Sequence, residues 1–280
     1  MTVTLKSLHL YPLKSCRGID LEEALLGARG LEAAGVGDRE WMVADPEGNF
    51  LTQRECPALA RVAVRLADAG SIACAASGRE LMLPAAPSAP RRVQARIWGA
   101  SLPALDEGDE AAAWFSGVLG RPARLLRFDP AVRRASNRGW TGSVEALNRF
   151  SDGYPMLLAS EASLADFNAR WQRAGHVPLP MSRFRPNLVI AGAEPYDEDH
   201  FAALSRGNVE LKPVKACPRC TIPSVDQSSG EVGPAPLELL SEYRHDPRAG
   251  GATFGQNVIV LRGEGARLRV GQAFSVAWTF

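Results

Sequence analysis

The chain has 280 residues and a nearly even charge balance, with 32 Lys and Arg against 31 Asp and Glu and a formal net charge of +1. Such a balance argues against a protein that binds nucleic acid or an anionic membrane through bulk charge. Five scattered cysteines argue against a disulfide framework. With no signal-peptide core at the start and no apolar run near the ~18 residues of a membrane span, we expect a cytoplasmic protein.

The 26 Gly and 20 Pro residues indicate many turns and a β-rich fold. The first run, residues 3–10, roughly alternates apolar and polar side chains, which predicts a strand that Pro12 ends. A helix is predicted over 106–120, with acidic residues near its start and Gly120 at its end. Further strands are predicted over residues 40–45 (in a hairpin with the FLTQ segment after it), 61–67, 79–84, 91–99 and 123–130.

The second half opens with a polar, turn-rich stretch at 133–155, which predicts a long loop. Ser160 fits the N-cap of an amphipathic helix, and Pro236 stands at the first position of a shorter helix over 236–244. Many short strands with few helices favour a mainly β, α+β architecture of barrel or sandwich type over alternating βαβ units. Strands are predicted over residues 155–160, 184–192, 208–216, 257–263 and 267–278.

The segment Cys217-Pro218-Arg219-Cys220 is the densest in reactive chemistry. A zinc or iron–sulfur site would need further cysteines or histidines at close spacing. A thioredoxin-type dithiol would open a helix, which the following Thr-Ile-Pro does not continue. Two readings remain: structural cysteines at a strand end, or one thiolate, favoured by the charge of Arg219, for a soft metal carried by a cofactor. These residues alone leave the choice open.

Three other segments place basic and short polar side chains at strand ends. They are YPLKSCRG with Lys14 and Ser15, GVGDREW with Arg39, and SRFRPNLVI with Arg185 and Asn187. Each basic residue taken separately is typical of a solvated loop charge. Together they suit a phosphate, since Arg offers a bidentate fork, Lys a point charge, and Ser and Asn neutral donors.

These segments, with SDGYP, CPRC followed by TIPSVD, and FGQN at 254–257, occur in one order along the chain. The set resembles MOSC-domain proteins that carry a MOSC N-terminal β-barrel domain, and among them the amidoxime-reducing components and their bacterial relatives. The resemblance covers nearly the whole chain. It implies two β-barrel-like domains, expected at residues 1–121 and 122–280.

The resemblance also implies a molybdenum cofactor and a set of residues that hold it. Cys220 is expected to ligate molybdenum, with Arg219 lining the site and Cys217 a bystander. The other expected contacts to the pterin and its phosphate come from Lys14, Ser15, Arg39, Asp152, Gly153, Tyr154, Arg185 and Asn187.

The implied activity is the reduction of N-hydroxylated substrates such as amidoximes and hydroxylamines to amines. Asp226 is a candidate proton relay, although a carboxylate in a Ser-Gly turn is also typical of a structural role. Electrons would come from a separate protein of flavin reductase, ferredoxin or cytochrome b5 type. Two alternatives stay open: a molybdenum-cofactor or sulfur carrier with a persulfide on Cys220, and a binding module without turnover.

Overall fold

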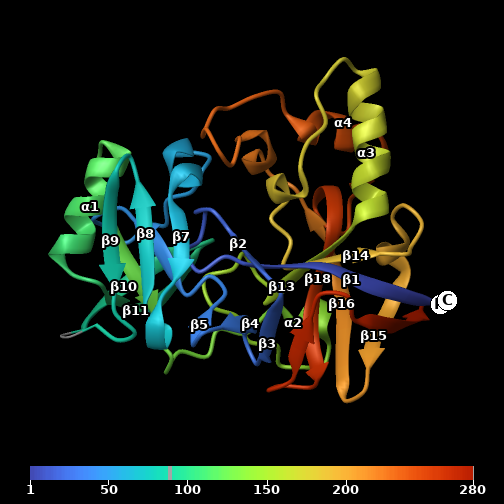
Figure 1. Cartoon of the computed structure of the whole chain (residues 1–280), viewed down its shortest axis with the longest axis horizontal. Helices are drawn as coiled ribbons and strands as arrows, with labels where there is room; N and C mark the ends of the chain where they lie inside the picture. The colour runs from blue at the N-terminus through green and yellow to red at the C-terminus, as the bar shows by residue number, and fades with distance from the viewer. Residues whose placement is uncertain (88–89, 280) are drawn as a thin grey trace.

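The computed structural model describes residues 1–87 and 90–279. Figure 1 shows small sheets on the left, with β7 to β11, and a larger group of strands on the right, with β1, β14, β15, β16 and β18. The predicted mainly β class with a few helices is confirmed. In the described part of the chain, no helix is both long and apolar enough to cross a bilayer.

The right-hand strands close into a seven-stranded barrel. Its order is β13-β14-β1-β20-β15-β16-β18, and antiparallel pairing of β18 with β13 completes the ring. The first strand belongs to it because Val3, Leu5, Leu8 and Leu10 point into the barrel while the residues between them are more exposed. The strands are β1 (Thr2–Leu10), β13 (Met156–Ser160), β14 (Leu188–Ala191), β15 (Phe201–Arg206), β16 (Val209–Pro218), β18 (Gly251–Arg262) and β20 (Ala273–Trp278), with short β2 (Ile19–Leu21) and β17 (His245–Asp246) at its margins.

The strands outside the barrel form three small sheets, ordered β10-β11-β12-β6, β7-β8-β9 and β19-β3-β4-β5. Strand pairing crosses the expected division after residue 121 in both directions, because β1 lies in the barrel and β12 pairs with β11 and β6. The strands are β3 (Glu23–Gly27), β4 (Gly30–Ala33), β5 (Val36–Gly37), β6 (Trp41–Ala44), β7 (Ala63–Leu66), β8 (Ile72–Ala76), β9 (Arg79–Leu83), β10 (Arg91–Ile97), β11 (Ala100–Asp106), β12 (Arg124–Phe128) and β19 (Arg267–Arg269).

The predicted helices form where their end signals stand. Helix α1 (Asp109–Leu119) ends at left-handed Gly120, and α4 (Pro236–Tyr243) begins with its proline. Helix α3 (Glu161–Arg173) is capped by Ser160, whose hydroxyl accepts a hydrogen bond from the Ala162 N–H at 3.2 Å. The predicted loop at 133–155 contains the short α2 (Arg138–Thr141). The strands β2 to β5, β8, β11, β15 and β17 were not predicted.

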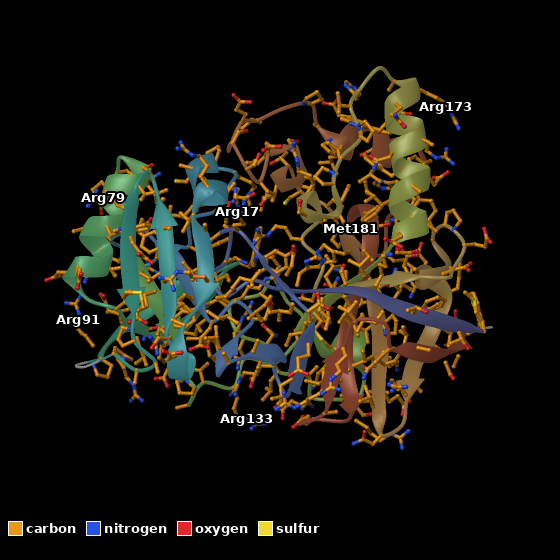
Figure 2. The ribbon with its side chains drawn as sticks, in the orientation of Figure 1. Arg17, Arg79, Arg91, Arg133, Arg173 and Met181 are labelled. Atoms are coloured by element: carbon orange, nitrogen blue, oxygen red, sulfur yellow. The ribbon has the colours of Figure 1, made fainter. Side chains whose placement is uncertain are left out.

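One apolar core continues from the small sheets into the barrel. Leu13 and Trp41 from the first half pack in the same buried cluster as Leu158 and Val258 of the barrel. Arg17 lies where the two groups of strands meet (Figure 2), and its guanidinium donates two hydrogen bonds to the carbonyl oxygen of Gln227. The two halves are therefore packed into one body, and loops from both reach the junction between them.

The seam that closes the barrel depends on a glycine. Gly255 in β18 has φ +76°, and a Cβ there would stand 2.6 Å from the Leu158 carbonyl oxygen of β13. Gly255→Ala should therefore lower the free energy of unfolding by at least about 2 kcal/mol more than Gly265→Ala does. Gly265 is the matched control, since it has φ +83° with open space around it. Equal losses in chemical denaturation would contradict this role for the seam.

Candidate active site

A pocket of about 120 Å³, open to solvent, lies at the junction of the two halves. Loops from the small sheets and from the barrel both contribute to its wall. Its lining contains five basic side chains against a single carboxylate, whereas the whole chain carries a net charge of only +1. All ten residues that the sequence predicted as cofactor or molybdenum contacts line it: Lys14, Ser15, Arg39, Asp152, Gly153, Tyr154, Arg185, Asn187, Arg219 and Cys220.

Strained backbone is concentrated at this pocket. Seven non-glycine residues of the described chain have positive φ, and four of them line the pocket. A side chain with a Cβ is disfavoured in the left-handed region and persists there only where the surrounding structure holds it. The clustering therefore marks the pocket as functional, independently of residue chemistry. The four are Ser15 (φ 67°), Arg39 (φ 48°), Trp98 (φ 50°) and Arg185 (φ 56°).

Asn187 holds Arg39 in place from the start of β14. Its Oδ1 accepts hydrogen bonds from Arg39 Nη1 at 3.0 Å and from the Leu157 N–H at 3.1 Å. Its Nδ2 donates to the His9 carbonyl at 3.1 Å and to Asp38 Oδ1 at 2.9 Å. With its amide fully engaged by protein, Asn187 acts here as a positioning residue and not as a free donor to a ligand.

Arg185 and Arg39 flank the ring of Tyr11, at 4.4 and 4.3 Å from its centroid. Arg185 Nη1 donates to the Cys16 carbonyl at 2.6 Å, while its Nη2 is buried without a hydrogen-bond partner. Burial lowers the pKa of Arg185 to about 10, and the nearby charge of Arg39 acts in the same direction. Two crowded guanidinium groups, one with an unused donor, favour a bound anion.

Lys14 and Asp152 form an ion pair across the junction. Lys14 Nζ donates to Asp152 Oδ1 at 2.5 Å, and the indole N–H of Trp98 donates to the same oxygen at 2.8 Å. Burial lowers the pKa of Lys14, against the opposing effect of Asp152. Enclosure by the pocket walls raises the pKa of Asp152, but the charge and hydrogen bond of Lys14 outweigh it and hold that pKa below its usual range.

Both cysteines of the C-x-x-C segment line the pocket, with Cys217 in the last two residues of β16 and Cys220 just after it, and both are free thiols. Arg219 Nη1 lies 3.2 Å from Cys217 Sγ, so the expected support of a thiolate by Arg219 is directed at Cys217 and not at Cys220. Burial raises the pKa of the Cys217 thiol, and Arg219 opposes this shift. Among the described residues, no three His, Cys, Asp or Glu side chains gather in a way that would hold a metal ion.

Asp226, the candidate proton relay, does not line this pocket. Its Oδ1 accepts hydrogen bonds from the Ser228 and Ser229 N–H groups at 2.9 Å, and its Oδ2 accepts one from Arg183 Nη2 at 2.9 Å. Hydrogen bonds from Ser228 and Ser229 hold its pKa below the usual range, and Arg183 adds to this effect. A carboxylate so strongly ionised anchors a turn and is a poor proton donor.

Several residues of the site were missed from the sequence. Asp38 precedes Arg39 in a segment that was already singled out, so its burial beside Tyr11 and Asn187 was the missing information. Gln53 and Gln227 exchange amide hydrogen bonds, and Gln53 Nε2 also donates to the Ser15 carbonyl at 2.7 Å. No local signal marks such a pair 174 residues apart. The other missed lining residues with polar or aromatic side chains include Arg54, Trp98 and Ser151.

The segments that form this pocket lie within regions that match models of known protein families. A model of the MOSC N-terminal beta barrel domain matches residues 2–122, and a model of the MOSC domain matches residues 146–275. The chain belongs to the MOSC-domain family. It is 37% identical to mouse mitochondrial amidoxime-reducing component 1 over 246 residues, which cover 86% of this chain and 71% of the relative.

Two further relatives extend the comparison. The human mitochondrial amidoxime-reducing component 1 is 35% identical over 250 residues, covering 87% of this chain and 73% of the relative. A zebrafish (Danio rerio) molybdenum cofactor sulfurase is 32% identical over 271 residues, covering 90% of this chain but only 31% of the relative. The chain is therefore similar both to amidoxime-reducing components and to a molybdenum cofactor sulfurase.

The structural role of Asp226 makes a prediction for stability. Asp226→Ala should lower the free energy of unfolding at pH 7 by about 1–3 kcal/mol, because it removes hydrogen bonds to an ionised group. The folded-state pKa lies below the ordinary value of about 3.9, so this contribution is complete above about pH 5 and shrinks as the pH falls further. Unfolding curves of both proteins at pH 7 and pH 3 provide the test. An unchanged unfolding free energy at pH 7 would contradict the turn-anchor role.

Proposed function

We propose that this protein reduces N-hydroxylated substrates such as amidoximes and hydroxylamines to amines, with a molybdenum cofactor bound in the junction pocket. The observation that carries the proposal is that one pocket unites the thiol of Cys220 with a cluster of basic side chains. A thiolate suits a soft metal, and the basic cluster suits a terminal phosphate. The similarity to amidoxime-reducing components supports the same reading.

The donor set fits such a cofactor. Arg185 Nη2, Arg219 Nε and Ser151 Oγ belong to lining residues, and each is buried without a hydrogen-bond partner in the protein. Unpaired buried polar atoms are costly and are rare in folded proteins. Their presence around one pocket is expected if a polar ligand normally completes the site. Lys14, Arg39 and Arg185 would hold the phosphate, and Cys220 would hold the metal.

When bound, the cofactor supplies a two-electron redox centre at which an N–O bond is broken. The protein's part is to fix its position from both halves of the chain, with Asn187 and Asp38 holding Arg39 in place. Overall, the substrate R–N–OH gains two electrons and two protons and yields the amine R–N–H and water. Asp226 lies outside the pocket, so we assign the protons to solvent water that enters through the open mouth.

The electrons require a partner. Besides the pair at 217 and 220, the cysteines are Cys16, Cys56 and Cys74, and all three are buried. Among the described residues they do not form a cluster that would hold iron and sulfur. We therefore propose a separate electron-donor protein of flavin reductase, ferredoxin or cytochrome b5 type.

A second candidate function is the transfer of sulfur or cofactor through a persulfide on Cys220. The similarity to a molybdenum cofactor sulfurase favours it. In that case the protein would release cofactor readily and would show no turnover with hydroxylamines or amidoximes. An enzyme would keep its cofactor through purification and would reduce these substrates with a chemical or flavin reductant.

Substitution of each cysteine in turn tests whether Cys220 alone holds the metal. In protein purified from a host that makes the cofactor, Cys220→Ser should abolish amidoxime reduction and change the molybdenum absorption spectrum, because it removes the metal ligand. Cys217→Ser is the matched control, since it lies in the same wall and contacts Arg219, and it should keep most of the activity. Molybdenum content by mass spectrometry and rates with an amidoxime are the measurements. Equal losses in both variants would contradict a single-ligand site.

A further inference from the structure

The tip of the β10–β11 hairpin carries an aromatic side chain where a turn does not favour one. Ile97 pairs with Ala100, so Trp98 and Gly99 form a two-residue connection, with φ 50° and 79°. Positive φ at both positions is the geometry in which Asn-Gly and Asp-Gly are preferred. A bulky residue there is a strained choice, and strain of this kind concentrates at functional sites.

Contacts on three sides fix the indole of Trp98. Its N–H donates to Asp152 Oδ1 at 2.8 Å, and its ring lies 5.1 Å from the ring of Phe50. The guanidinium of Arg54 lies over the ring at 4.8 Å from its centroid. The indole is thus held in one orientation although it belongs to a hairpin tip.

The indole is not part of the apolar core. Trp98 is 52% exposed, and it lines the same pocket as Cys220. A hydrogen bond to Asp152 alone would not need an aromatic residue, since asparagine could donate one and would suit the turn better. An aromatic residue supplies a flat ring, which Phe50 and Arg54 contact in part, and about half of Trp98 stays exposed beside the pocket, where a flat ligand group would complete it.

We propose that Trp98 is a specificity-determining residue that stacks on the planar, conjugated part of the substrate. The inference rests on the proposed function for the identity of the substrate, and it goes beyond it by assigning substrate selection to the N-terminal hairpin. Aromatic groups prefer offset or edge-to-face contact with one another. The protein should therefore favour amidoximes conjugated to a ring over small aliphatic ones.

Two substitutions distinguish the effect of the aromatic ring from that of its hydrogen bond to Asp152. Trp98→Gly removes the ring and suits the positive φ, so the hairpin is expected to fold. Trp98→Phe keeps an aromatic ring but removes the hydrogen bond to Asp152. The matched control is Ser77→Gly, because Ser77 and Gly78 connect β8 to β9 with φ 52° and 74°, and neither residue lines the pocket.

The measurements are kcat and KM with benzamidoxime and with acetamidoxime, together with calorimetric titration of each compound into the oxidised holoprotein without reductant. Trp98→Gly should raise KM and Kd for benzamidoxime about 3- to 10-fold, the range expected for loss of one aromatic contact. Both constants for acetamidoxime, both kcat values and the molybdenum content per chain should stay unchanged. Trp98→Phe should keep a lower KM and Kd for benzamidoxime than Trp98→Gly has, and Ser77→Gly should behave as the wild type does.

Equal rises for the two compounds, or no rise for benzamidoxime, would overturn the inference. Loss of molybdenum from Trp98→Gly would also overturn it, because the indole would then cover the cofactor and not the substrate. If the wild type reduces neither compound, the proposed function fails. The calorimetric comparison of wild type with Trp98→Gly then decides by itself whether Trp98 selects planar ligands.

Discussion

The hydrogen bonds of Asn187 connect the parts of the chain on which the pocket depends. Its side chain binds the end of β1 through His9, the start of β13 through Leu157, and the segment before β6 through Asp38 and Arg39. These elements belong to both halves of the molecule. A short amide can satisfy two donors and two acceptors at once, which an apolar residue of the same size cannot. Together with the hydrogen bond from the Tyr11 N–H to Asp38, it fixes a charged loop against the barrel.

Several energetically unfavourable features of backbone and side chains lie close together around this network. Left-handed backbone at Ser15, Arg39 and Arg185, two guanidinium groups beside one tyrosine, and an unpaired Arg185 Nη2 would each destabilise an isolated fold. They are tolerated because the core that surrounds them is continuous between the two halves. A bound phosphate would relieve the charge crowding and use the free donor, so the site is organised before its ligand arrives.

The sequence predicted the class of fold, the helix ends at Ser160 and Gly120, and ten of the residues that line the pocket, because these depend on local patterns and on motif order. It did not predict that β1 completes the barrel, since strand pairing between distant segments leaves no local signal. The sequence offered both a proton-relay role and a structural role for Asp226. The hydrogen bonds of the turn around this carboxylate favour the structural role. The sequence also suggested that Arg219 supports the metal-binding thiolate. The Arg219 side chain instead points to Cys217, and this direction cannot be predicted from the sequence.

We propose above all that a metal-bearing cofactor binds at the junction of the two halves, with Cys220 as its protein ligand. Anomalous X-ray diffraction at the molybdenum absorption edge, from crystals of protein purified from a cofactor-producing host, tests this most directly. We expect one molybdenum peak at bonding distance from Cys220 Sγ and a phosphate within reach of Lys14, Arg39 and Arg185. A peak bonded to Cys217, or a metal outside this pocket, would contradict it.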